Sequence, residues 1–167
     1  MTRVSAGFWA ALIAITVSTV VLRLAEPLGL QVGGGVLLRF VVLYLGPVVE
    51  GLSIDRAWTA AGLPGPSSPT FGLVFRYVSG FGIAVLYVFV LERVLAGNGL
   101  IKGVLFSFVP WLVAGLVVMP LLGEGAFGVQ ELPVSGVTYF FAANLSFSVV
   151  LGVLYERFRK TRGNRSE

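Results

Sequence analysis

Few side chains in this chain could carry chemistry, because it contains no histidine and no cysteine. The lack of cysteine excludes disulfides, thiol catalysis, iron–sulfur clusters and thiolate zinc sites. The lack of histidine removes the commonest metal ligand and general base. Glu124, between Gly123 and Gly125, could serve as an acid, a cation ligand or an ordinary loop residue. No second carboxylate is close to it in sequence, so we expect the loop role and neither a catalytic nor a metal site.

Arg76 is a charged side chain about a turn and a half into an apolar stretch at residues 71–91. A charge at membrane depth is costly and often functional. Because Arg76 is near the end of the stretch, we expect it to extend to the lipid headgroups. The alternative is that it turns inward and pairs with Glu124, Glu131 or Glu50.

Asn144 is an amide well inside the last apolar stretch, and an amide in a bilayer must find a hydrogen-bond partner. One interpretation is a polar lining for a substrate or cofactor. The other, which we favour, is a hydrogen bond between two helices. The candidate partners are Ser107, Thr16, Ser18, Thr19 and a backbone carbonyl freed by Pro110.

A group of aromatic residues could cradle a pigment, a quinone or a lipid tail. Its members are Phe108, Trp111, Phe140, Phe141 and Phe147. Aromatic side chains are routine in membrane spans, however, where they fill the core or face lipid. We therefore expect packing and predict no cofactor.

The composition is that of a membrane protein. Of 167 residues, 56% are hydrophobic and only 12% are charged, against about 25% charged in soluble domains. We predict an all-α fold, a single bundle of four transmembrane helices followed by a basic tail. The expected spans are residues 4–22, 71–91, 100–122 and 133–155, and the tail is 156–167.

The apolar run at residues 36–50 is too short for a span, which needs about 20 residues. Pro47 interrupts it. An interfacial or re-entrant helix is therefore expected there. The polar segment 54–70, rich in glycine and proline, is expected to be a loop.

The distribution of lysine and arginine predicts the orientation. With four spans, eight of the twelve basic residues lie on the side of the termini and four on the other. The positive-inside rule then places both termini in the cytoplasm. Five of the twelve follow Glu156, so the net charge of +4 indicates an anchor beside anionic lipid rather than a nucleic-acid partner.

The stretch from Leu100 to Gly128 is the one around which the other apolar segments are arranged. Pro110 removes a backbone hydrogen bond and predicts a kink near the middle of its helix. The helix is expected to end near Met119 and Pro120, before a glycine-rich turn.

Two spans share a spacing of polar, small and aromatic residues. Arg76, Gly80, Ala84 and Tyr87 are spaced by 4, 4 and 3, as are Asn144, Ser148, Gly152 and Tyr155. Since both helices run in the same direction, this predicts a parallel internal repeat. Ordinary packing of small residues remains an equal alternative.

A set of small, aromatic and proline residues recurs along the part of the chain from about Phe71 to Tyr155: Gly80, Tyr87, Trp111, Met119, Pro120, Leu121, Gly123, Gly125, Phe127, Leu145, Phe147, Leu151, Gly152 and Tyr155. In these residues the sequence resembles the YagU-like and related families, uncharacterised four-span membrane proteins of prokaryotes. Those families often have histidine at the positions of Arg76 and Asn144. The resemblance implies the four-span architecture and a prokaryotic cytoplasmic membrane, and it brings no known activity.

Three functions are compatible with the sequence. The expected one is a non-catalytic accessory or scaffold subunit, whose partners are membrane lipids and either further copies of the chain or a larger membrane complex. The second is a small-solute transporter or channel built on the internal repeat. The third, an intramembrane lipid enzyme, would need Glu124, Glu50 or Asp55, none of which has an obvious partner, so we expect no enzyme.

Overall fold

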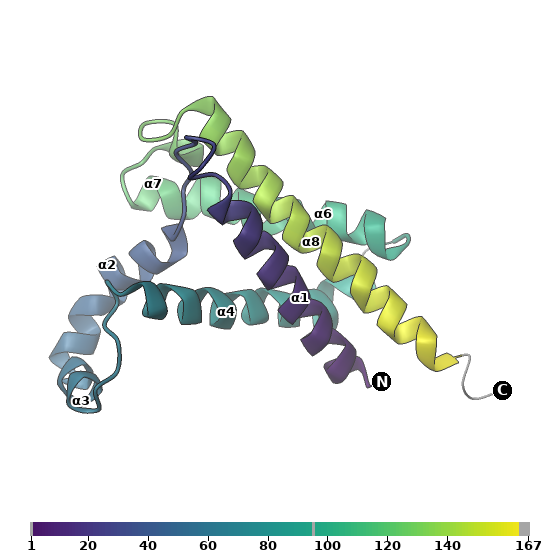
Figure 1. Cartoon of the computed structure of the whole chain (residues 1–167), viewed down its shortest axis with the longest axis horizontal. Helices are drawn as coiled ribbons and strands as arrows, with labels where there is room; N and C mark the ends of the chain where they lie inside the picture. Colours follow the sequence, from purple (N-terminus) through teal and green to yellow (C-terminus); the bar gives the residue numbers. More distant parts are fainter. Residues whose placement is uncertain (1, 95, 164–167) are drawn as a thin grey trace.

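The computed structural model describes residues 2–94 and 96–163, and within them it contains helices and no strand. Four helices are long and apolar enough to cross a membrane, which confirms the all-α bundle (Figure 1). They are α1 (Arg3–Arg23), the continuous α4, η1 and α5 (Pro69–Leu86, Tyr87–Leu91, Glu92–Val94), the continuous α6, η2 and α7 (Gly99–Val113, Ala114–Val118, Met119–Leu121), and α8 (Val134–Gly163).

Two further helices and one short turn occupy the connections. They are α2 (Val36–Gly51), α3 (Ile54–Ala60) and the 3-10 turn η3 (Ala126–Gly128). Helix α3 lies where the sequence predicted only a loop, and the indole of Trp58 donates a 3.0 Å hydrogen bond to the Pro64 carbonyl beyond it. Helix α8 continues past the expected end at residue 155, so the start of the basic tail is helical. Residues 164–167 of that tail, and the side chain of Asp55, lie outside the described part.

Polar side chains fix where three of the long helices begin. Thr2, Ser68 and Asn98 stand at the N-caps of α1, α4 and α6. Each side-chain oxygen accepts a hydrogen bond of 3.0–3.1 Å from the backbone N–H three residues later. Such caps satisfy N–H groups that a helix leaves unpaired at its start.

The helix that contains Pro110 departs from α geometry later than predicted. Helix α6 continues through Pro110 to Val113, and the irregular turn is the π-helical η2, just before Pro120. A proline ring crowds the carbonyl four residues earlier, which for Pro120 belongs to Leu116 within η2. A wider turn relieves this crowding.

Helix α8 lies between α1 and α6, and α4 packs against the other side of α1 (Figure 1). Glycines set the distance between α6 and α8. A Cβ on Gly152 would clash with the carbonyl oxygen of Gly99, and a Cβ on Gly103 would lie 2.6 Å from that of Ser148. The two helices can cross this closely only because the residues at the crossing are glycines or have very small side chains.

Most of the buried positions of α1 are small residues. Its buried positions are Ala6, Gly7, Ala10, Ala11, Ala14, Ile15 and Ser18. A Cβ on Gly7 would lie 3.1 Å from Val88, and one on Gly80 would lie 2.7 Å from Ile15. The stripes therefore bring α1 close to its neighbours α8 and α4.

The main hydrophobic core lies toward the end of the bundle where α1 begins and α8 ends (Figure 1), which we call the terminal end; the opposite end is the loop end. At its centre the Tyr87 ring lies 5.1 Å from Phe106 and 6.1 Å, edge-on, from Tyr155. Leu151 is fully buried beside them. The core thus joins η1, α6 and α8, and the first half of α1 packs on it.

Helix α2 has 16 residues and is not among the four candidate spans. It is attached at the loop end. Tyr44 donates a 2.9 Å hydrogen bond to the Leu121 carbonyl, and Arg39 forms a salt bridge with Glu124. Val36 joins a second small core with Val118 and Met119.

Candidate functional site

Arg76 lies two turns into α4 and turns toward α1. Its Nε donates to Thr19 Oγ1 over 2.8 Å, and its Nη2 donates to Ser18 Oγ over 2.9 Å. In the described part of the chain it forms no salt bridge. Arg76 therefore turns inward, and two neutral hydroxyls hold it instead of one of the glutamates that the alternative named. Its expected extension to the lipid headgroups stays a prediction.

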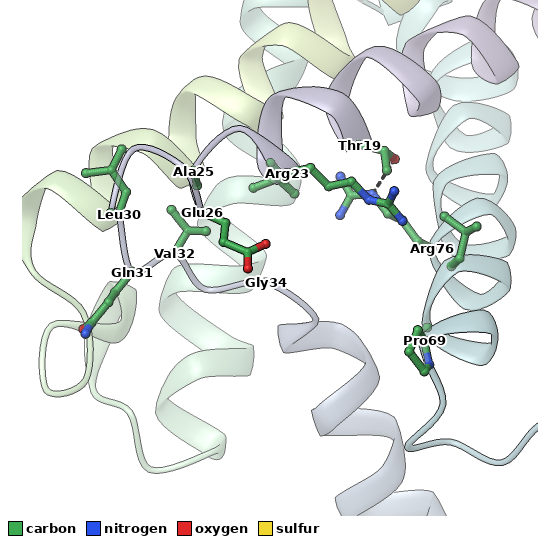
Figure 2. Close-up of a pocket in the computed structure, with 14 residues that line it drawn as sticks. Thr19, Arg23, Ala25, Glu26, Leu30, Gln31, Val32, Gly34, Pro69 and Arg76 are labelled. Atoms are coloured by element: carbon green, nitrogen blue, oxygen red, sulfur yellow. Dashed lines mark hydrogen bonds between the residues drawn. The ribbon is translucent and has the colours of Figure 1, made fainter.

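A cavity of about 770 Å³ opens beside Arg76, between the end of α1, the segment at residues 25–34 and the start of α4 (Figure 2). Three charged side chains line it: Arg23, Glu26 and Arg76. The Glu26 carboxylate points into the cavity from the segment that follows α1. Two arginines and one glutamate give the lining one net positive charge. Within the described residues none of the three forms a salt bridge.

The sequence explains why these charges gather at the loop end. Arg23 occupies the last turn of α1, where a cation interacts favourably with the helix dipole. Gly29 has a φ of 67°, in the left-handed region that suits glycine, and its N–H donates to the Glu26 carbonyl in the turn that follows α1. Pro69 starts α4 behind the Ser68 cap, which places Arg76 about two turns from the helix start.

The terminal end holds a second, smaller cavity of about 290 Å³, and its charges are paired. Glu92 Oε1 accepts a 2.7 Å hydrogen bond from Arg159 Nη1 and lies 3.6 Å from Lys102 Nζ. Lys102 also donates to the Glu92 carbonyl over 2.7 Å. Glu156 pairs with Lys160 over 2.6 Å.

Two buried hydroxyls lie deeper at the terminal end. Ser148 Oγ and Tyr155 Oη are buried and have no hydrogen-bond partner in the described part of the chain. Buried polar groups are usually paired, so each is an exception within this core. The Arg159 guanidinium lies over the Tyr155 ring, 5.8 Å from its centroid, a cation–π arrangement.

The two predicted repeat segments occupy different surroundings. Both bring a tyrosine, Tyr87 and Tyr155, into the same core. The small residues then differ, because Gly80 meets the side chain of Ile15 whereas Gly152 meets the backbone of Gly99. Helix α8 has a helix on each side, and α4 packs mainly on α1. The shared spacing thus serves packing at both sites.

Asn144 does not bridge helices as the sequence suggested. Its Nδ2 donates a 2.9 Å hydrogen bond to the Phe140 carbonyl, one turn earlier in α8. The bond is local because the carbonyl four residues back lies within reach of any short polar side chain on a helix. The candidate partners on α1 and α6 are not its donors or acceptors in the described part.

Glu124 is not the ordinary loop residue that was expected. The side chain is 8% exposed and forms the salt bridge to Arg39, which is 85 positions earlier. Gly123 and Gly125, with φ of 80° and 73°, allow the tight turn that directs it inward. Opposite charges in two segments that connect the spans were the available signal, but the sequence does not say which of them pair.

The aromatic side chains of the predicted group pack mainly against one another. Trp111 lies 4.9 Å from Phe141 and 4.5 Å from Phe127, and Phe108 lies 5.6 Å from Phe141. Phe127 also packs against Gly115, where a Cβ would clash with its ring. Phe147 belongs to the main core.

No family model, no curated protein and no solved structure matches the chain. The assignment therefore depends on the four helices, whose length and apolar composition suit a bilayer. This is a membrane protein. The resemblance to the YagU-like families stays a prediction from the residues that carry it.

Proposed function

We propose that the protein is a non-catalytic accessory or scaffold subunit that packs against another membrane protein through α4. The carrying observation is the uneven burial of the four spans. We compare one apolar stretch of 18 residues in each span. In the span that begins with α4, 17% of these residues are buried, against 28% in the spans that contain α6 and α8 and 39% in α1. Helix α4 thus has the largest share of its surface left for lipid or a partner.

The outward side of α4 has a shape that suits another helix. Val74, Val78 and Phe89 are exposed along it. Gly82 lies between them, and a Cβ there would meet nothing within 4 Å. A glycine between branched residues leaves a notch in which a second helix can approach closely. The other small stripes are already used inside the chain, which leaves this one for association.

The test is purification of the full chain in mild detergent or native nanodiscs, with mass spectrometry of what co-purifies. We expect a stoichiometric membrane partner with the natural sequence. Gly82→Ile should release it, because the isoleucine fills the notch without touching the rest of the chain. Gly46→Ile is the matched control, since a Cβ at Gly46 in α2 also meets nothing. A lone monomer, or equal retention by both variants, contradicts the proposal.

A second function, transport of a small solute, is favoured by the cavity at the loop end. It has a volume of about 770 Å³ and is open to the outside of the molecule. Solute flux into proteoliposomes that contain the purified protein tests this function. Flux that is lost in Arg76→Gln would support it, and its absence together with a stoichiometric partner would leave the subunit role.

For the orientation we propose a prokaryotic cytoplasmic membrane with both termini in the cytoplasm. The support is the concentration of basic residues at the terminal end, where Lys102, Arg159 and Lys160 lie. A reporter fused to the C-terminus should read as cytoplasmic. A periplasmic signal would reverse the topology.

A further inference from the structure

We propose that the cavity between α1 and α4 is a binding site for a phosphate group, from either a phospholipid headgroup or free phosphate, and that Arg76 and Arg23 hold it. This inference does not depend on the subunit role, because it concerns a different side of the molecule from the outward row of α4. Its basis is the state of Arg76, the charge of the lining and the position of the cavity.

Arg76 is oriented with donors to spare. A guanidinium carries five N–H donors, and the two hydroxyls use two of them, which leaves three. Thr19 Oγ1 donates its own proton to the Ile15 carbonyl over 2.7 Å, so toward Arg76 it can only accept. The side chain is thus fixed in its plane on the wall of the cavity before any ligand arrives. Planar, fixed guanidinium groups suit phosphate oxygens.

The charge of the lining selects an anion. The partners of the Arg76 guanidinium are neutral hydroxyls, so no counter-charge within the described residues neutralises it. Arg23 adds a second guanidinium, and Glu26 offsets one of the two. The single positive charge that remains matches a phosphate diester, which carries one negative charge. A phosphate monoester, with about −1.5 to −2 at neutral pH, is matched less closely.

The position of the cavity suits a headgroup. Arg23 is the last residue of α1, and Pro69, at the start of α4, lines the same cavity. The ends of spanning helices lie at the level of lipid headgroups. Leu22, Leu30 and Leu73 add apolar lining, along which the glycerol end of a lipid can rest. The cavity at the terminal end has no such role, since its cations are already paired with Glu92 and Glu156.

The experiment uses the full-length protein in detergent micelles and native mass spectrometry to measure bound ligand. The probes are short-chain phosphatidylglycerol, short-chain phosphatidylethanolamine and, as the control without phosphate, diacylglycerol. Inorganic phosphate is tested separately by phosphorus NMR. We expect the two phospholipids to bind and diacylglycerol to remain unbound.

The variants assign the binding to this cavity. Arg76→Gln keeps a donor for the hydroxyls but removes the charge, and we expect a loss of affinity of about tenfold or more. Arg23→Gln should also weaken binding, and because Arg23 is exposed and forms no salt bridge within the described residues, this variant should fold even if the first does not. Arg56→Gln, an exposed arginine on α3, is the matched control and should bind like the natural sequence.

The outcomes separate the sources of the phosphate. Phospholipid binding that depends on Arg76 and Arg23 supports the site and identifies a headgroup. Binding of inorganic phosphate alone, with the same dependence, supports the site and identifies a free anion. Binding that is absent, that includes diacylglycerol equally, or that is unchanged in the arginine variants overturns the proposal.

Discussion

The two ends of the bundle hold charged side chains in opposite ways. At the terminal end, Glu92 lies between Lys102 and Arg159, and each cation is paired. At the loop end, Arg76 is held by hydroxyls beside a larger open cavity, and no carboxylate in the described residues pairs with it. The comparison separates a group of charges that serves the fold from one that has donors left for a ligand.

The difference follows from what surrounds each group. The buried tyrosines draw η1, α6 and α8 together at the terminal end, so charged residues just beyond the core are forced near one another. At the loop end, the space between the end of α1 and the start of α4 is bounded by the segment at residues 25–34 and not by a third long helix. A loop leaves room for water or ligand where a packed helix does not. We therefore expect substitutions at the terminal end to change stability and substitutions in the loop-end cavity to change binding.

The largest effect should come from separating α6 and α8 at the terminal end. Gly152→Leu places a side chain where a Cβ already clashes with the Gly99 carbonyl oxygen. Because a backbone carbonyl cannot move aside, we expect a loss of about 3 kcal/mol or more in the free energy of unfolding. Denaturation in mixed detergent micelles measures it.

The control for that substitution is Gly82→Leu in α4, which has open space around it and should stay within about 0.5 kcal/mol of the natural sequence. Equal losses in both variants would show that the cost comes from the glycine itself and not from the close crossing of the helices.

A smaller effect is expected from removing the paired carboxylate. Glu92→Gln keeps the shape of the side chain, which is 15% exposed, but leaves Lys102 and Arg159 without their counter-charge. We expect a loss of about 1–3 kcal/mol in the free energy of unfolding, because hydrogen bonds to charged groups in partly buried sites contribute this much. Thermal unfolding in detergent provides the measurement.

The matched substitution at the loop end is Glu26→Gln, a carboxylate without a salt bridge in the described part of the chain. It should leave the unfolding temperature unchanged. If Glu26→Gln destabilises as much as Glu92→Gln, the contrast between the two ends is wrong.

The sequence predicted the features that depend on local pattern. Apolar runs of sufficient length located four helices, and spacings of four residues found the small positions that face neighbouring helices. A tyrosine at the end of each spaced set entered the core. These succeed because the helical period alone determines which residues share a face.

The features that the sequence missed depend on which segments meet. Arg39 and Glu124 are far apart in the chain, and α2 had to be placed before their pairing was visible. Arg76 had three plausible glutamate partners and met hydroxyls of α1 instead. Helix α3 was not predicted because its segment is polar, short and followed by turn residues. Helix propensity is a weak signal over so few residues.

The smallest expected effect tests the amide of α8. Had Asn144 bridged two helices, Asn144→Leu would destabilise the bundle. Its hydrogen bond to the Phe140 carbonyl is local, however, and that carbonyl already lies within the helix. A local bond of this kind adds little and is lost without leaving a partner on another helix unpaired.

For Asn144→Leu we therefore expect a change within about 0.5 kcal/mol in the free energy of unfolding, measured in the same micelles. A loss above about 1 kcal/mol would restore a role for Asn144 between helices and would add a second polar group, beside Arg76, whose surroundings matter for the loop-end half of the bundle.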